Sequence, residues 1–392
     1  MAQPAQAAAA EGAKHERLAW RSWVPWALVV LAFVITLISA LNVWVKRQAL
    51  SDSNWANASG QLLENEKVRS ALSIYLVNQI YENVDVAQAL EQRLPPRAKG
   101  LAQPLAAGLQ GAAVTAVNAV LSRPRVQQLW KEANRRAHEL FMAVLNGKHG
   151  VLASTGGNVV LNLRPILEQL GAQTGLGSRL AERLPPDAGQ ITIMKGNQLD
   201  TARKTVKVIR VLSYFLFFLV IAIFGLAIWL AREGKKRAVL LGAGISVLAV
   251  GLLVLVIRRY AGEYLVSALT TNADAKDAVR ASWAIGTALL RNVGINAVIY
   301  GAVIVFAAWI AGPSRAATWS RRQLAPTMRD RPWIIYGAVT VVLLLILLAG
   351  PTDAQRIFPL LILFALAYVG TEFLRRQTAR EFPAPATASG PA

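Results

Sequence analysis

The 392-residue chain is 54% hydrophobic and 16% charged, and its 42 Lys and Arg against 22 Asp and Glu give a net charge of +20. Charged residues normally make up about a quarter of a soluble domain, so this composition, which comes from long apolar runs, indicates a membrane protein. The chain has no Cys and only three His, which excludes disulfides, thiol nucleophiles and Cys-bound metal centres.

Six stretches are long and apolar enough to cross a membrane, for which a helix needs about 20 mostly apolar residues. None carries a charged residue in its middle. The stretches are 24–45, 211–231, 238–257, 293–311, 332–350 and 358–374. Basic residues precede the first run, as in a signal peptide, but the run is longer than a signal-peptide core and no clear small-residue cleavage site ends it. We therefore expect an uncleaved anchor.

The expected fold is mainly α, a polytopic membrane protein with six transmembrane helices and a mainly helical extracytoplasmic domain. Lys and Arg near the span ends are more numerous in the loops on the same side of the membrane as the N-terminus than in those on the other side. This comparison leaves out the residues that flank the long segment after the first span. Because basic residues near span ends mark the cytoplasmic side, both termini are expected in the cytoplasm. The expected segments are a disordered tail at 1–22, a first transmembrane helix at 23–45, an extracytoplasmic domain at 46–207, a five-helix bundle at 208–375 with an outer loop at 258–292, and a disordered tail at 376–392.

Apolar residues recur at helical spacing through the expected extracytoplasmic domain. One stripe comprises Val68, Leu72, Tyr75, Leu76 and Ile80, and another comprises Leu101, Leu105 and Leu109. The strongest pattern predicts a helix over 124–146, with Pro124 near its start and Gly147 just beyond its end. Its apolar stripe contains Val126, Leu129, Trp130, Ala133, Ala137, Leu140, Phe141 and Val144. This stripe leaves Asn134, Arg135, His138 and Glu139 on the side that faces water.

Short strands and two helix continuations complete the predicted elements. Strand candidates at 151–153 and 158–163 flank a Gly-Gly turn and can form a β-hairpin, and a third at 190–194 can extend it to a three-strand sheet. No helix breaker separates 197–210 from the second span, so one continuous helix is expected there. A further helix is expected to start at 272–277, to run through Trp283 into the fourth span, and to pack beneath the extracytoplasmic domain.

The familiar catalytic and metal-binding patterns are missing, so we expect a protein that is not an enzyme and that uses no cofactor or metal. His138-Glu139 lacks the second His of a zinc-protease pair, while His15 and His149 stand in a basic tail and a Gly-rich turn. The sequence also offers no phosphate-binding loop, nucleophile elbow or dinucleotide fingerprint after a strand.

Transport is the alternative function, because one span, a large outer domain and five further spans also make up half of a resistance-nodulation-division exporter. Such pumps couple protons through ionisable groups inside the bilayer. At mid-depth the spans offer neutral polar residues instead, which disfavours a proton-driven pump. These residues are Ser213, Tyr214, Ser246, Asn296 and Tyr300. The alternative that remains is a lipid or small-molecule transporter without an intramembrane proton relay. Such a transporter should have a cavity lined by Ser213, Asn296 or Tyr300.

A group of basic residues, the basic collar, flanks the two points at which the chain passes between a span and the extracytoplasmic domain. It comprises Lys46, Arg47, Arg203, Lys204, Lys207 and Arg210. Each basic residue near an anionic surface can contribute about 1 kcal/mol of binding, so the collar is a candidate site for anionic lipid head groups. Ordinary interfacial placement of long basic side chains is the alternative. Nucleic-acid binding is rejected, because the charges lie in short loops at span ends without a folded basic domain.

Three segments and the order of the spans resemble a set of multi-pass membrane proteins of high-GC actinobacteria, which are generally described only as integral or conserved membrane proteins. The segments are Leu129-Trp130-Lys131-Glu132-Ala133-Asn134-Arg135-Arg136-Ala137-His138, Val159-Val160-Leu161-Asn162-Leu163 and Asn197-Gln198-Leu199-Asp200-Thr201-Ala202-Arg203. The resemblance implies the arrangement of one span, a helical outer domain and five further spans. It brings no assigned activity and no catalytic residues.

These patterns together predict a non-enzymatic integral plasma-membrane protein that serves as a scaffold, sensor or accessory subunit for cell-envelope components through its extracytoplasmic domain. The expected partners are membrane lipids, with another envelope or membrane protein as a further candidate. A scaffold should have a solidly packed bundle and an exposed apolar patch on the outer domain.

Overall fold

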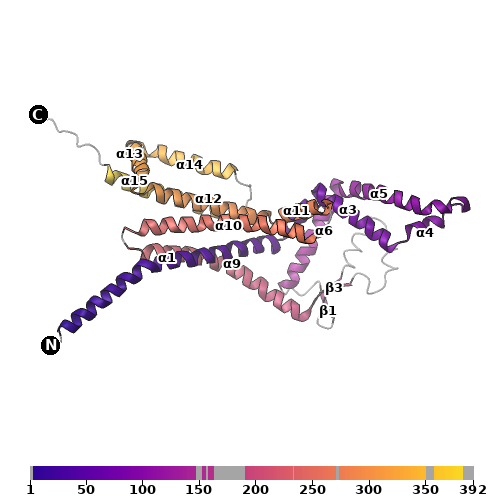
Figure 1. The fold of residues 1–392 in the computed structure, drawn as a ribbon, viewed down its shortest axis with the longest axis horizontal. Helices are drawn as coiled ribbons and strands as arrows, with labels where there is room; N and C mark the ends of the chain where they lie inside the picture. The colour runs from indigo at the N-terminus through magenta and orange to yellow at the C-terminus, as the bar shows by residue number, and fades with distance from the viewer. Residues whose placement is uncertain are drawn as a thin grey trace. The chain divides into compact units, whose positions relative to one another are not determined.

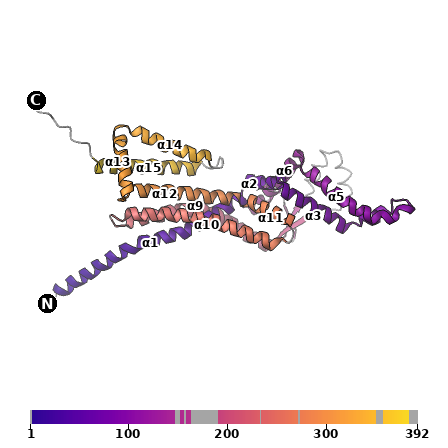
Figure 2. The ribbon, with the colours of Figure 1, turned by 45° about the horizontal axis from the view of Figure 1, so that its top comes forward.

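The computed structural model divides into two compact units, which are described separately (Figures 1 and 2). Unit 1 comprises Met1–Leu41, Phe215–Arg258 and Leu290–Ala392, and unit 2 comprises Asn42–Tyr214 and Arg259–Leu289. The structure describes the backbone of residues 3–146, 152–155, 158–162, 190–232, 234–270, 273–349 and 357–382. Side chains are described from residue 23 onward within these ranges, apart from those of 152–198, 273–274, 346–347, 349, 357–360 and 362.

Unit 2 is built mainly of helices. They are α2 (Asp52–Glu64), α3 (Glu66–Asn83), α4 (Val86–Glu91), the 3-10 helix η1 (Pro96–Leu101), α5 (Ala102–Leu121), α6 (Pro124–Leu145) and α11 (Ala273–Gly286). Three of them begin at a side chain that accepts a free backbone N–H of the first turn, namely Ser51 for α2, Asn65 for α3 and Asp85 for α4. Helix α2 packs on α6, α3 packs on α5, and α11 packs on both α2 and α3.

The remaining long helices belong to unit 1 or run from one unit into the other. They are α1 (Gln3–Ala49), α9 (Gly196–Leu230), α10 (Lys236–Leu269), α12 (Ala288–Ile310), α13 (Arg315–Asp330), α14 (Pro332–Ala349) and α15 (Ile357–Glu381). In unit 1, α1, α9 and α10 meet around a small apolar core. Its buried members are Val29, Ala227, Ala231 and Val239.

Within the described residues, five helices are long and apolar enough to cross a membrane, so the chain is a multi-pass helical membrane protein. Four of them coincide with the first four predicted spans: Trp23–Ala49, Leu199–Leu230, Lys236–Leu269 and Ala288–Ile310. The fifth, Pro96–Leu121, lies in unit 2 and was not predicted as a span. The predicted span at 332–350 corresponds to a shorter apolar helix, Pro332–Leu345, and that at 358–374 lies partly outside the described side chains.

Three boundaries differ from the sequence prediction. Residues 3–22 continue helix α1 instead of forming a disordered tail, because the Ala-rich stretch has high helix propensity. Residues 376–381 likewise belong to α15, while 383–392 lie outside the described residues. The helix through Trp283 is interrupted at one residue before the fourth span, because α11 ends at Gly286 and α12 begins at Ala288, with Thr287 between them.

Two other helix predictions are confirmed. Helix α9 runs without a break from Gly196 to Leu230, as the absence of a helix breaker predicted. Helix α6 runs from Pro124 to Leu145, with the proline in its first turn, where a missing backbone N–H does no harm.

Three short strands form an antiparallel sheet in the order β1-β2-β3. They are β1 (Leu152–Thr155), β2 (Asn158–Asn162) and β3 (Gln190–Lys195). Strands β1 and β2 pair with Thr155 opposite Asn158, and β3 pairs with β2 through an irregularity between Val159 and Val160. The sheet ends one residue before Gly196, where α9 begins.

Glycines allow α10 and α12 of unit 1, which run side by side in both views, to touch along their backbones (Figures 1 and 2). A Cβ added at Gly301 would lie 2.4 Å from the backbone nitrogen of Leu248, and one added at Gly251 would lie 2.7 Å from the carbonyl oxygen of Gly294. Close approach through small residues is the usual way in which helices associate in lipid, where burial of apolar surface gives no advantage. The glycines therefore allow α10 and α12 to pack closely.

The C-terminal end of α12 is held by side chains from three other elements of unit 1. Arg237 donates to the Ala308 carbonyl (2.8 Å), and Gln377 of α15 donates to the Ala311 carbonyl (3.2 Å). Arg321 of α13 is 2% exposed and donates to the carbonyls of Ile310 (2.5 Å) and Gly312 (2.7 Å) while pairing with Glu381 (2.8 Å). The last carbonyls of a helix lack partners within the helix and carry partial negative charge, so cationic donors stabilise this end.

We expect Arg321→Ala to destabilise unit 1 by roughly 2–4 kcal/mol, because it leaves two carbonyls and the Glu381 carboxylate without their donor. Arg321→Lys should recover part of the loss, since an ammonium supplies charge but not the planar fork that reaches three acceptors. The measurement is the thermal midpoint of the purified protein in detergent, followed by tryptophan fluorescence. Arg322→Ala, at the exposed neighbouring position, is the control. We call the contacts of Arg237, Arg321 and Gln377 with the last carbonyls of α12 the clamp. Equal thermal midpoints for Arg321→Ala and Arg322→Ala would show that Arg321 does not stabilise the protein through this clamp.

Candidate functional site

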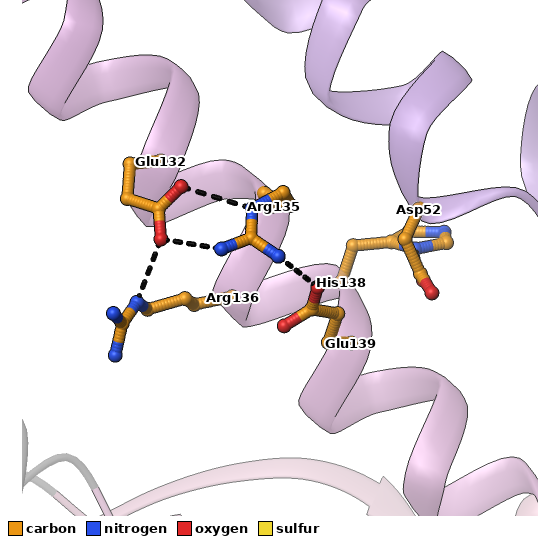
Figure 3. Close-up of polar contacts among 6 residues, drawn as sticks. All are labelled: Asp52, Glu132, Arg135, Arg136, His138 and Glu139. Atoms are coloured by element: carbon orange, nitrogen blue, oxygen red, sulfur yellow. Dashed lines mark hydrogen bonds and ion pairs between the residues drawn. The ribbon is translucent and has the colours of Figure 1, made fainter.

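The most specific polar arrangement in unit 2 lies where α1 ends and α2 begins, and His138 of α6 is at its centre (Figure 3). The imidazole Nδ1 lies 2.6 Å from Oδ1 of Asp52, the first residue of α2, and Nε2 lies 3.0 Å from the carbonyl oxygen of Ala49, the last residue of α1. The ring also stacks on Trp55, with centroids 5.1 Å apart. We call these four residues the His138 junction.

The two acceptors determine how many protons the His138 junction needs. A backbone carbonyl can only accept, so Nε2 must carry a hydrogen. Because Nδ1 faces a carboxylate, one further proton lies between Nδ1 and Asp52. An imidazolium that donates from both nitrogens satisfies this geometry, and the Asp52 side chain, 44% exposed, keeps water on its remaining lone pairs.

This position corrects the prediction that His138 faces water, because the residue is only 5% exposed. Helix α2 covers the flank of α6 that carries His138, where Met142 and Leu145 are also buried and the Trp130 indole donates to the Ser59 carbonyl (2.9 Å). Much of the predicted apolar stripe lies outside this contact, and Leu129 is 57% exposed. The sequence pattern assigned His138 to the water-facing side because histidine is polar. A polar side chain can be buried when it is hydrogen-bonded, but its partners are not visible in the sequence.

The opposite flank of α6 carries a network of exposed ion pairs (Figure 3). Glu132 accepts hydrogen bonds from Arg135 (2.6 and 2.9 Å) and Arg136 (2.9 Å), and Arg135 also pairs with Glu139. These bonds to the charged carboxylate lower the pKa of Glu132 to about 2, and Glu132 in turn raises the pKa of Arg135. The Glu132 carboxylate therefore stays ionised at acid pH, and its pairs with Arg135 and Arg136 are lost only as the pH falls toward 2. The side chains of Glu132, Arg135 and Glu139 are 40–43% exposed, so these pairs add little to stability.

The basic collar does not act as one surface in the structure. The guanidinium of Arg203 donates to the Val144 carbonyl at the end of α6 (3.1 and 3.2 Å), and Arg210 donates to the Asn146 side chain that follows it (2.8 Å). Lys46 lies 3.8 Å above the ring of Tyr214, and the Arg47 carbonyl accepts from Asn54 (2.8 Å). The remaining two collar residues, Lys204 and Lys207, are exposed on α9.

Arg203 and Arg210 of the collar thus have a structural role that was not predicted from the sequence. Val206 lies on the same stretch of α9 and is buried with Met142 and Leu145 of α6. Together with Arg203 and Arg210, it fixes the end of α6 to the first turns of α9 within unit 2. The signal that could have found this is the spacing of Arg203, Val206 and Arg210, which puts all three on one helix face.

The polar residues considered for transport have different environments. The Ser213 hydroxyl is buried and contacts Oδ1 of Asn42 and the Ile209 carbonyl, which joins α9 to the end of α1 within unit 2. Tyr214 is 65% exposed beneath Lys46. Asn296 and Tyr300 are half-buried on α12 in unit 1.

Among the residues that the structure describes, no three His, Cys, Asp or Glu side chains come together in a way that could hold a metal ion. The side chains of His15 and His149 lie outside the described residues. Comparison with protein-family models, with curated proteins and with solved structures finds no significant match to the chain. A proposal for the function must therefore rest on the physical features of the two units.

Proposed function

We propose that this multi-pass membrane protein is a non-enzymatic scaffold, sensor or accessory subunit of the plasma membrane that contacts envelope components through unit 2. In this proposal the chain has six spans and both termini in the cytoplasm, and residues 46–207 are extracytoplasmic. The distribution of Lys and Arg near the span ends supports this orientation. The resemblance to actinobacterial multi-pass proteins of the same layout agrees with it and stays part of the proposal.

The observation that carries the proposal is the exposed apolar surface of helices α3 and α5. We call residues 66–121, from the start of α3 to the end of α5, the apolar arm. Tyr75 and Ile80 on α3 are 59% and 53% exposed, and Leu101, at the start of α5, is 56% exposed. Water-soluble monomers seldom leave large contiguous apolar patches uncovered, so such a surface marks a place where another component binds.

A second contact is proposed for the exposed lysines of the basic collar. Lys204 and Lys207 lie on α9 one turn apart, where ammonium groups can reach anionic lipid head groups. Arg203 and Arg210 are omitted from this part of the proposal because they bind α6.

Native mass spectrometry of the protein, purified gently from its own membrane, tests the proposed role. A stoichiometric protein companion is expected. A small molecule bound to an otherwise lone chain, and lost on substitution of Asn296 or Tyr300, would overturn the scaffold proposal in favour of a transporter.

Fusion of reporters tests the proposed orientation independently. A reporter that is active only in the cytoplasm should give signal after Arg380 and should stay silent when inserted near Gly100. The reverse pattern would overturn the orientation.

A further inference from the structure

The two long helices of the apolar arm pack through small side chains. Helices α3 and α5 lie side by side (Figures 1 and 2), and the residues buried on them include Ser73 and Val77 on α3 and Ala102 and Ala106 on α5. Gln110 donates to Asn78 (2.9 Å) across the same pair of helices. Small residues and a side-chain amide bond at the contact are characteristic of helices that pack in lipid.

The large apolar side chains of the arm point the other way. Leu101, Leu105 and Leu109 are spaced four residues apart and form an exposed row along η1 and α5, while Tyr75 and Ile80 are exposed on α3. A helical hairpin built for water places its Leu and Ile in the contact and its small or polar residues outside. The arm has the opposite distribution.

We propose that the apolar arm is embedded in the interface of a lipid bilayer, with the leucine row in contact with acyl chains. This inference rests on the proposed function, because it names the envelope component that the same surface contacts. Helix η1 with α5 is one of the five helices apolar enough to cross a membrane, yet only 6% of its most apolar stretch is buried. Lipid can cover a surface that is exposed on several sides of both helices, whereas a single protein partner covers one face.

The arm lies along the interface instead of crossing the bilayer. Arg69 on α3 donates to Asn118 on α5 (3.0 Å) and to the carbonyl of Glu64 (3.1 Å), so a charged, hydrogen-bonded end closes one side of the arm. The opposite end, where α4 and η1 follow one another, carries the exposed charges Glu91, Arg93, Arg97 and Lys99. Helix α3, which accompanies α5 along the arm, is not among the described helices that are apolar enough to cross a membrane, so the pair lies along the membrane surface.

The absence of Cys from the sequence allows a direct test, because each introduced Cys is the sole attachment site for a nitroxide label. Leu105→Cys and Leu109→Cys place the label on the leucine row of the full chain. Phe218→Cys, 61% exposed on the membrane helix α9, is the lipid control, and Gln128→Cys, exposed on α6, is the water control. The labelled proteins are reconstituted into vesicles of phosphatidylethanolamine and phosphatidylglycerol with an excess of empty vesicles, so that the arm can reach either its own bilayer or another.

The measurement is the collision rate of each label with oxygen, which concentrates in lipid, and with a water-soluble nickel chelate. We expect labels at Leu105 and Leu109 to match Phe218, with frequent oxygen collisions and few nickel collisions. Nickel accessibility equal to that at Gln128 would overturn the inference. So would spectral broadening that disappears on dilution with unlabelled protein, because a second copy would then cover the leucine row. Neither result affects the two tests of the proposed function, which are the reporter pattern and the presence of a stoichiometric companion.

Discussion

Replacing His138 by alanine is expected to destabilise unit 2 by about 2–3 kcal/mol, although a surface histidine would tolerate the change. The substitution removes both donors of the His138 junction, leaving the Ala49 carbonyl and the Asp52 carboxylate without their partner, and it opens a space beside Trp55. The thermal midpoint in detergent should fall by roughly 5 °C or more. His138→Gln, whose amide can replace one of the two donors, should recover part of this loss.

A double-substitution cycle separates the His138–Asp52 interaction from other effects of each change. Asp52→Asn also weakens the favourable charge at the start of α2, so its single effect overstates the pair. The coupling between Asp52→Asn and His138→Gln is expected to be about 1–2 kcal/mol, in the direction of mutual stabilisation. Glu132→Gln serves as the control on the exposed flank of the same helix and should leave the midpoint nearly unchanged. If His138→Ala behaves like Glu132→Gln, the junction does not hold α6 to the start of α2.

Gly301→Ala is also expected to destabilise the protein, by about 1–3 kcal/mol. The new methyl group would lie 2.4 Å from the Leu248 nitrogen and 2.6 Å from its Cα, and backbone atoms cannot rotate away as a side chain can. Helices α10 and α12 must therefore move apart along their whole glycine contact. Unfolding in detergent, followed by circular dichroism, measures the loss.

The matched control for this substitution is Gly225→Ala in α9, where an added Cβ meets nothing within 4 Å. The greater helix propensity of alanine should make this variant as stable as the parent or more stable, by up to about 1 kcal/mol. A loss at Gly225 equal to that at Gly301 would indicate a general sensitivity of the helices, and the close contact would not be the cause.

The long elements of this fold follow from the sequence because length and apolar content are enough to define them. Four membrane helices, the unbroken α9 and the bounds of α6 could be predicted in this way, since each is a property of a continuous stretch. The break at Thr287 could not, because no proline stands there and apolar residues continue on both sides of it.

The faces of the helices were harder to predict because they depend on which neighbour covers them. The row Leu101, Leu105 and Leu109 was correctly placed on one side of a helix, but that side is exposed, and Ala102 and Ala106 are buried instead. The candidate site shows the same difficulty, since the partners of His138 lie 86 and 89 residues away in sequence. Pairings at that distance leave no trace in local periodicity.

The clamp at the end of α12 sets an order in which a newly made chain can mature. Arg237 has already been synthesised when α12 emerges, but Arg321 pairs with Glu381, 60 residues later, and Gln377 also belongs to the last described helix. The carbonyls of Ile310 and Gly312 therefore wait for α13, and the carbonyl of Ala311 waits for α15. A chain that ends before α15 lacks both Gln377 and Glu381, so the Ala311 carbonyl has lost its side-chain donor and Arg321 has lost its carboxylate partner.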